Sequence, residues 1–190
     1  MRSHDPHPSS AAALAALLLV QVCLGYEWLV SGLTKLVHGD FPSGLARELG
    51  DMSRTSPGWY RDFLSGTVVP HAAAFGYAIE IAEVAVGGVL LVAAAVWLAG
   101  GGVPAAWLRA WQLAAGAGAL VGLALVVNFE LANGGTFGVR LASDSFDEGV
   151  DLDTLMIGLQ LAVIVWSAAA LPRRATLHAW SSGSTASRPA

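Results

Sequence analysis

The chain has 190 residues, a length that suits one domain, and it is 55% hydrophobic but only 13% charged. Soluble domains are typically about 45–50% apolar and about 25% charged, so this composition favours a membrane protein. The formal net charge of −4 excludes a basic surface that could neutralise phosphates, so we expect no nucleic acid partner.

Four apolar stretches are long enough to cross a lipid bilayer, for which about 20 residues suffice. They cover residues 12–37, 71–99, 104–132 and 152–171. The first stretch continues beyond the length of a signal peptide and is followed by no small-x-small cleavage site, so we predict a retained span. Gly100–Gly101–Gly102 predicts a tight hairpin between the second and third spans, and Pro104 suits the first turn of the third.

Polar segments flank and connect these spans. Residues 1–10 are predicted to be disordered and residues 175–190 to form a polar tail, which leaves a membrane domain over residues 11–174. Between the first two spans, Leu45, Leu49 and Met52 recur at helical spacing, with charged residues on the opposite side. This pattern predicts a short interfacial amphipathic helix within an all-α, four-transmembrane-helix bundle.

Four spans place both termini on the same side of the cell membrane. Lysine and arginine residues near the span ends set the orientation of such a protein, and the two sides carry five each. Arg173 and Arg174 come directly after the fourth span, which favours cytoplasmic termini. We therefore predict a multi-pass protein of the cell membrane with both termini in the cytoplasm.

Polar side chains inside the first two spans are predicted to face each other. At about 100° per residue, one stripe of the first span carries Glu27, Ser31, Thr34 and Lys35. One face of the second span carries Gly76, Glu80, Glu83 and Gly87. Small residues beside polar ones mark helix–helix contacts in membranes, because they let two backbones approach each other.

Consecutive spans run in opposite directions, so these ionisable groups are expected in one leaflet. Asn128 and Glu130, near the end of the third span, and Asp153, at the start of the fourth, are expected at the same end. Three carboxylates and one lysine cannot all be charged cheaply in a low-dielectric site, so the cluster predicts a site for proton exchange or for a polar headgroup. The structural alternative is that these charged side chains only link the first two spans.

The sequence LGYEWLVSGLTKL at residues 24–36 resembles the first-span signature of the DoxX/DoxD family of four-span membrane proteins. In that signature a glycine, here Gly25, is followed by an apolar stretch, by a small residue directly before a glycine, here Ser31 and Gly32, and by a lysine, here Lys35. Residues 57–91 are similar to the DoxD pattern of an aromatic segment, a proline, and a glutamate with glycine four residues later, here Glu83 and Gly87. The resemblance covers residues 17–100, and Gln21 departs from it because many DoxX-type members carry arginine there.

The resemblance implies a four-helix bundle and a role in a redox system, because DoxD-type proteins are associated with thiosulfate:quinone oxidoreductase. We therefore expect a membrane subunit that binds a polar-headed small molecule such as a quinone. The expected binding residues are Glu27, Ser31, Lys35, Glu80, Glu83, Asn128 and Glu130. Four of them are candidates for catalysis: Glu27, Lys35, Glu80 and Glu83.

Electron transfer would require a further component, because the chain has a single cysteine, Cys23, and no predicted metal site. We therefore expect a cofactor-bearing redox partner subunit in addition to the lipid bilayer. The alternative function is a non-catalytic scaffold or anchoring subunit, whose charged cluster is structural or binds a partner helix. A small-solute carrier is a third hypothesis, and its four spans would leave a narrow pathway unless the protein forms a homo-oligomer.

Overall fold

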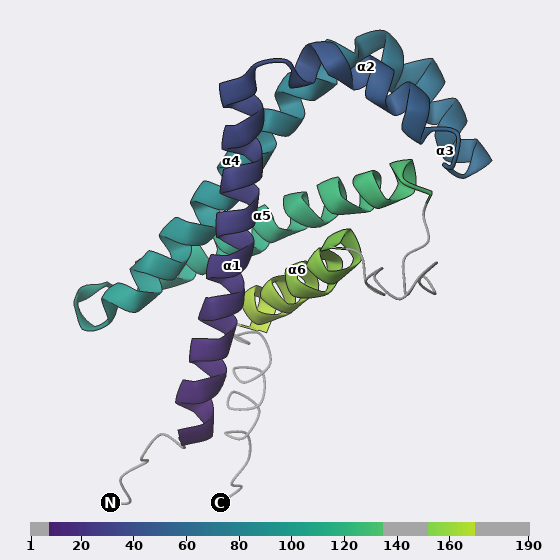
Figure 1. Cartoon of the computed structure of the whole chain (residues 1–190). Helices are drawn as coiled ribbons and strands as arrows, with labels where there is room; N and C mark the ends of the chain where they lie inside the picture. The colour runs from purple at the N-terminus through teal and green to yellow at the C-terminus, as the bar shows by residue number, and fades with distance from the viewer. Residues whose placement is uncertain (1–7, 135–151, 170–190) are drawn as a thin grey trace, which may run out of the picture.

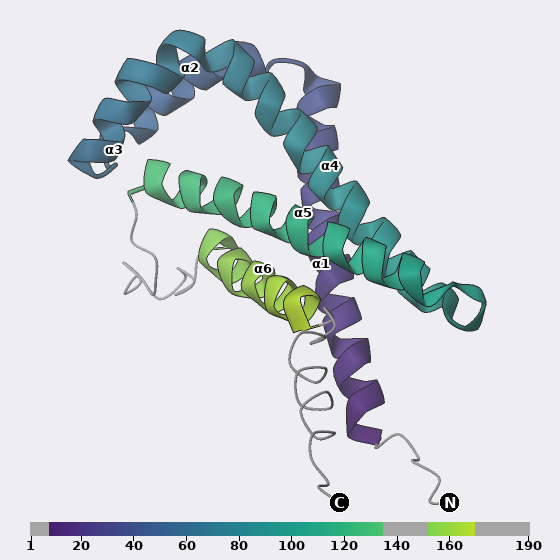
Figure 2. The same ribbon diagram turned by 180° about the vertical axis from the view of Figure 1, so that it is seen from behind.

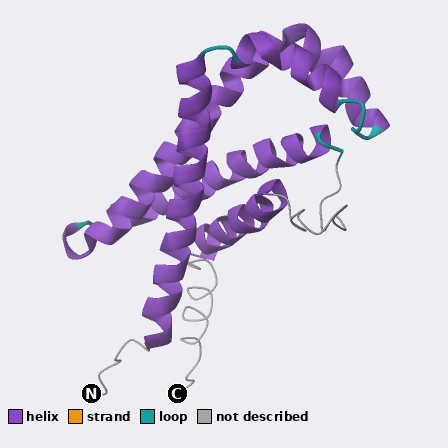
Figure 3. Cartoon of the chain, in the orientation of Figure 1, coloured by secondary structure: helices purple, strands orange, loops and turns teal. Residues whose placement is uncertain are grey.

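The structure, a computed structural model, describes residues 8–134 and 152–169. Within these two ranges the chain is helical or forms short connections, and they contain no strand (Figure 3). The predicted all-α class is therefore confirmed. The helices are α1 (Pro8–His38), α2 (Phe41–Met52), α3 (Gly58–Phe63), α4 (Ala72–Ala99), α5 (Ala105–Ala132) and α6 (Leu152–Ala169).

Four helical stretches are long and apolar enough to cross a membrane, in agreement with the prediction. They are Ala12–His38, Gly58–Ala99, Ala105–Ala132 and Leu152–Ala169. The second is longer than predicted, because a π-helical turn (Leu64–Val68) and a 3-10 turn (Val69–His71) join α3 to α4 without a break. The chain is a multi-pass helical membrane protein whose apolar helices contact the lipid bilayer.

Two helix starts differ from the predictions. Helix α1 begins at Pro8, so residues 8–10 are helical rather than disordered, and proline suits a first turn because its missing N–H is not needed there. Pro104 precedes α5 instead of lying in its first turn, and its carbonyl accepts a hydrogen bond from the Trp107 N–H at 2.9 Å. The rest of the predicted disordered N-terminus and the 175–190 tail lie outside the described residues.

The long helices pack around a central apolar core. Helix α1 packs across α4 and also contacts α6, while α5 lies side by side with α6 and packs on α4 (Figure 1, Figure 2). The predicted hairpin between α4 and α5 is formed by a 3-10 turn at Gly100–Gly102, and Gly100 has a φ of +60° that favours glycine. The buried core includes Leu24, Trp28, Leu90 and Val163.

Glycines allow α1 and α4 to approach closely. A Cβ added to Gly87 would collide with the backbone nitrogen of Leu29, and one added to Gly32 would lie 2.8 Å from the backbone nitrogen of Val84. The predicted face of Gly76, Glu80, Glu83 and Gly87 is buried throughout, which confirms it as the packing face of α4. This close contact sets the depth at which polar side chains on the two helices meet.

The connection between α1 and α4 folds back over the start of α4. The predicted amphipathic helix is confirmed as α2, and its apolar residues Leu45 and Leu49 are buried against the protein in a second apolar cluster. A Cβ on Gly76 would lie 2.5 Å from the Cα of Pro42, so α2 packs directly on the α4 backbone. The Ser56 hydroxyl donates to the Ala132 carbonyl at 2.7 Å, which joins this connection to the end of α5.

Two adjacent glycines test the close contact between α1 and α4. We expect Gly87→Ala to lower the melting temperature of the detergent-solubilised protein by several degrees, because overpacking a contact of this kind costs about 1–3 kcal/mol. Gly88 has open space around its Cα, so Gly88→Ala should leave the melting temperature unchanged or raise it through higher helix propensity. Equal melting temperatures for the two variants would contradict the contact.

Candidate functional site

A charged pair links α1 to α4 where the two helices are closest. The Lys35 ammonium donates to both carboxylate oxygens of Glu83, with Nζ–Oε2 and Nζ–Oε1 distances of 2.6 and 2.8 Å. It also donates to the Ser31 hydroxyl at 2.8 Å, and that hydroxyl donates to Glu83 Oε2 at 3.1 Å. The predicted pairing of the charged residues of the two spans is thus realised by Lys35, Ser31 and Glu83.

The surroundings of this pair are low in dielectric but not closed. The Glu83 side chain is 0% exposed and the Lys35 side chain 21% exposed. Lys35 Nζ also lies 5.2 Å from the centre of the Phe41 ring, a favourable cation–π contact. Burying a charge costs free energy unless the charge is paired and hydrogen-bonded. Lys35 and Ser31 therefore stabilise the ionised form of the buried Glu83 carboxylate.

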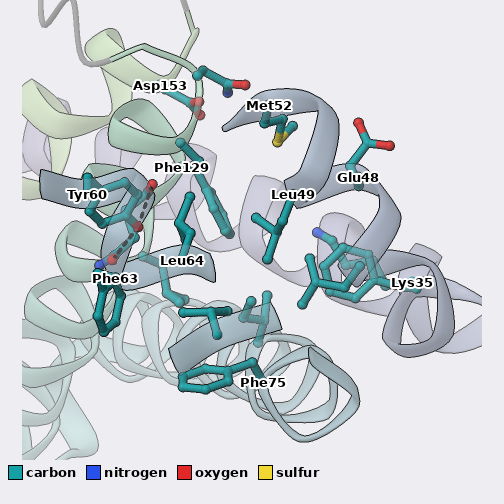
Figure 4. Close-up of a pocket in the computed structure, with 18 residues that line it drawn as sticks. Lys35, Glu48, Leu49, Met52, Tyr60, Phe63, Leu64, Phe75, Phe129 and Asp153 are labelled. Carbon is teal, nitrogen blue, oxygen red and sulfur yellow. Dashed lines mark hydrogen bonds between the residues drawn. The ribbon is translucent and has the colours of Figure 1, made fainter. Parts of the chain in front are cut away.

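A cavity of about 470 Å³ begins at Lys35 and extends beneath α2 and α3 (Figure 4). Small-molecule sites in proteins typically enclose about 300–1,000 Å³. Thirteen of the 18 lining residues are apolar or aromatic, and the full set includes residues from each of the helices α1 to α6. The larger apolar side chains are Phe41, Leu45, Leu49, Met52, Phe63, Leu64, Phe75, Ile79, Leu125 and Phe129.

The cavity has polar groups at two opposite sides. Lys35 lies at one side, and a hydrogen bond between Tyr60 and Asn128 lies at the other (Figure 4). The Tyr60 hydroxyl donates to Asn128 Oδ1 at 2.9 Å, and the Asn128 amide nitrogen donates to the Ala124 carbonyl at 2.7 Å. Asp153 also lines the cavity, so groups from the ends of α1, α5 and α6 converge as the alternating direction of the spans predicts.

Five of the seven predicted binding residues do not line this cavity: Glu27, Ser31, Glu80, Glu83 and Glu130. Glu27 is exposed on the outer face of α1 and makes no hydrogen bond or ion pair with any described residue, so its predicted place in the cluster is wrong. Gly25 and Gly32 are buried against α4 and Trp28 against α5 and α6, which turns Glu27 away from α4. Glu80 and Glu130 are buried, at 1% and 2% exposure, but neither lines the cavity.

Glu80 is in a different environment from Glu83, although both lie on the same face of α4. Its Oε1 atom is buried and has no hydrogen-bond partner among the described residues. Asn128 was expected at the mouth of the site together with Glu130, and only Asn128 lines the cavity. The structure therefore separates the predicted set into Ser31, Lys35 and Glu83 on one side of the cavity and Asn128 on the other.

Sequence reasoning missed a set of buried amides in the middle of the bundle. Gln112 donates to the Ser167 hydroxyl at 2.9 Å and Gln21 donates to the Leu90 carbonyl at 2.9 Å. When the Gln160 amide is oriented to satisfy both of its groups, its oxygen accepts from Trp28 Nε1 at 2.5 Å. Glutamines within apolar spans were the sequence feature that could have indicated these links, because such amides seek partners on neighbouring helices.

The arrangement is suited to binding an amphipathic molecule. The apolar lining would hold a hydrocarbon or ring system, while Tyr60, Asn128 and Lys35 offer polar atoms at its edges. All three donor positions of the Lys35 ammonium are already directed at Ser31 and Glu83. The Tyr60 hydroxyl donates its proton to Asn128, whereas the Asn128 amide uses one of its two N–H groups on Ala124, so the second N–H of Asn128 is the better placed donor for a guest.

The chain matches no protein-family model, no curated protein and no solved structure. The resemblance of residues 17–100 to the DoxX/DoxD family therefore stays a prediction from the sequence.

The Lys35–Glu83 pair can be tested by removing one or both charges. We expect Lys35→Met to lower the free energy of unfolding by about 3–5 kcal/mol, because it leaves the buried Glu83 carboxylate without its partner. The double variant Lys35→Met with Glu83→Met should recover most of that loss, since it removes the buried charge as well. Equilibrium unfolding in mixed micelles measures both values.

The exposed pair of Arg54 and Asp51 is the matched control, with side chains 80% and 69% exposed. Arg54→Met should leave the unfolding midpoint unchanged, because solvent-exposed ion pairs contribute little. If Lys35→Met behaved like Arg54→Met, the pair would not stabilise the contact between α1 and α4.

Proposed function

We propose that the chain is a membrane subunit of a redox system and binds a quinone or a similar polar-headed hydrophobic molecule. The observation that carries this proposal is the cavity of about 470 Å³, which is apolar along its length and has polar groups at two opposite sides. Its size is within the range of small-molecule sites. The resemblance to the DoxX/DoxD family supports the thiosulfate- and quinone-linked form of this proposal.

The residues present fit a quinone-like guest by chemical type. Apolar side chains such as Leu49 and Phe129 would contact its ring and chain, and the second N–H of the Asn128 amide would donate to one of its oxygens. The Lys35 ammonium, paired with the buried Glu83, would lie at the opposite side, where the Glu48 carboxylate also lines the cavity. When bound, a quinone supplies two-electron, two-proton redox chemistry.

A partner subunit is part of this proposal. Amino-acid side chains of the kind that line this cavity do not carry electrons over a distance, so a cofactor on another protein would deliver them. The chain would then provide the membrane anchor and the binding site for the acceptor. Its own residues would position the guest and exclude lipid from it.

A non-catalytic scaffold is the second candidate, and one observation favours it. Both oxygens of Glu83 and all three donor positions of Lys35 are engaged inside the protein, as in a purely structural link. In that case the charged pair would fix the register of α1 and α4, and the chain would serve to anchor its partner. Ligand binding separates the two candidates, because a scaffold has no need of the cavity.

A bulky side chain placed in the cavity tests the binding proposal. We expect purified wild-type protein in nanodiscs to bind decylubiquinone saturably, and Leu49→Trp to weaken binding at least about tenfold, because the indole would occupy the space of the guest. Leu161→Trp is the control, because Leu161 is exposed on α6 and does not line the cavity. Titration of bound quinone by equilibrium dialysis measures the affinities.

The same variants test the redox role in native membranes. Thiosulfate-dependent quinone reduction should fall in Leu49→Trp and persist in Leu161→Trp. Binding that is absent in the wild type, or equal in the two variants, would contradict the quinone site and favour the scaffold. Binding without any thiosulfate-dependent reduction would retain the site but exclude thiosulfate as the electron donor.

We also propose that both termini lie in the cytoplasm, on the basis of Arg173 and Arg174 after the fourth apolar stretch. A cysteine introduced at Gly101, in the hairpin turn, should then resist a membrane-impermeant thiol reagent applied to intact cells. A cysteine introduced at Gly50, on the opposite side, should react. The inverse labelling pattern would reverse the orientation, and each variant should also carry Cys23→Ser to remove the native thiol.

A further inference from the structure

Glu27 is an ionisable residue on the outer face of a membrane span. It lies two residues beyond Gly25, the midpoint of the candidate span Ala12–His38, and its side chain is exposed. With a rise of about 1.5 Å per residue, Glu27 is roughly 16 Å from the end of α1 at His38. Because the hydrocarbon core of a bilayer is about 30 Å thick, this carboxylate is near its centre.

No described residue donates a hydrogen bond to the Glu27 carboxylate or forms an ion pair with it. Ionisable residues at such depth almost always face the bundle interior or a water-filled cavity and are paired there. Lys35 is the nearest basic residue of the same span, but its ammonium is bound to Glu83 and Ser31 and lies roughly 12 Å further along the helix. By contrast, the exposed faces of α4 and α6 carry no charged side chain.

The residues around Glu27 have the spacing of a helix-pairing seam. Exposed apolar side chains recur along α1 at intervals of four and three residues. They are Leu19, Cys23, Tyr26, Val30, Leu33 and Val37. This is the heptad spacing of two helices that pack with a left-handed twist, and Glu27 and Thr34 occupy equivalent flanking positions seven residues apart. Charged residues at flanking positions select the partner helix in such pairs.

We propose that this face of α1 binds a transmembrane helix of a partner protein, and that this helix carries a lysine or arginine opposite Glu27. A cation is the partner that the unpaired carboxylate requires in a low-dielectric medium. A second copy of this chain fits less well, because the same face would bring a second Glu27 carboxylate instead of a cation. The proposal does not rest on the quinone site, because Glu27 does not line the cavity.

Site-specific photocrosslinking in native membranes tests this surface. A photoreactive phenylalanine analogue at Tyr26, beside Glu27, should form one discrete adduct, whereas the same analogue at Ile81, exposed on α4, should not. Mass spectrometry should place the crosslink in an apolar segment of another protein that contains a lysine or arginine. Capture of another protein without such a residue would overturn the proposal.

A charge reversal then tests the chemistry of the contact. Glu27→Lys should reduce the Tyr26 adduct about tenfold or more, and changing the partner's basic residue to glutamate should restore it. Glu48→Gln, which removes an exposed carboxylate on α2, should leave the adduct unchanged. Purified Glu27→Lys protein should bind decylubiquinone as the wild type does, so failure of the cavity proposal and failure of this one are distinguishable.

Other occupants of the face give different results, and each would overturn the proposal. A second copy would give an adduct of twice the 19.6 kDa chain mass, crosslinked through α1 of both copies. A segment of the same chain would give a crosslink within one polypeptide. Lipid alone would give no protein adduct, and an adduct insensitive to Glu27→Lys would show that the carboxylate does not select the partner.

Discussion

The close contact between α1 and α4 is the constraint on which the rest of the structure depends. A Cβ at Gly32 or Gly87 would overlap the backbone of the facing helix, so α1 and α4 are in direct backbone contact at this crossing. Lys35 follows Gly32 by three residues and Glu83 precedes Gly87 by four, so the contact delivers the ammonium to the carboxylate at 2.6 Å. A slip of one helix along the other would leave two uncompensated charges in a low-dielectric medium. The pair therefore adds specificity of register to a contact that van der Waals packing stabilises.

The cavity is a consequence of what happens to the chain beyond this contact. After α1 ends at His38, α2 turns back over the start of α4 and places Leu45 and Leu49 toward the protein. The continuous helical stretch from Gly58 to Ala99 carries Tyr60 past the end of α5, where the hydroxyl meets Asn128. The Lys35–Glu83 pair joins α1 to α4 at one side of the cavity, and the Tyr60–Asn128 hydrogen bond joins α3 to α5 at the other. The side chains that line the space between these two links are mostly apolar. An apolar space between two polar attachments is what an amphipathic guest requires.

Much of this fold could be predicted from the sequence, because long apolar runs and a 3.6-residue period report directly on membrane helices. The buried face of α4 was predictable for the same reason, since Gly76, Glu80, Glu83 and Gly87 recur at helical spacing. By contrast, the side of α1 that packs on α4 could not be predicted from the sequence. The polar stripe of α1 is about 100° wide, which is wider than the face that one neighbouring helix can cover. Gly25 and Gly32 allow the closest approach, so their side of α1 packs on α4 and Glu27 is left exposed. The Tyr60–Asn128 bond and the glutamine links join residues far apart in the chain, and periodicity within one helix holds no information about such pairs.

Helix α1 carries both the internal pair and the outward-facing carboxylate, and this has a mechanical consequence. Glu27 and Lys35 are eight residues apart, which corresponds to about 80° around the helix, so they face different neighbours on one rigid element. A partner helix bound at Glu27 would contact the same helix whose end lines the cavity with Lys35. Rotation of α1 toward the partner would pull Lys35 away from Glu83, and the cost of leaving that carboxylate unpaired opposes such rotation. The buried pair would therefore hold the orientation of the outer face of α1, so that a partner meets a preformed surface instead of one that it must induce.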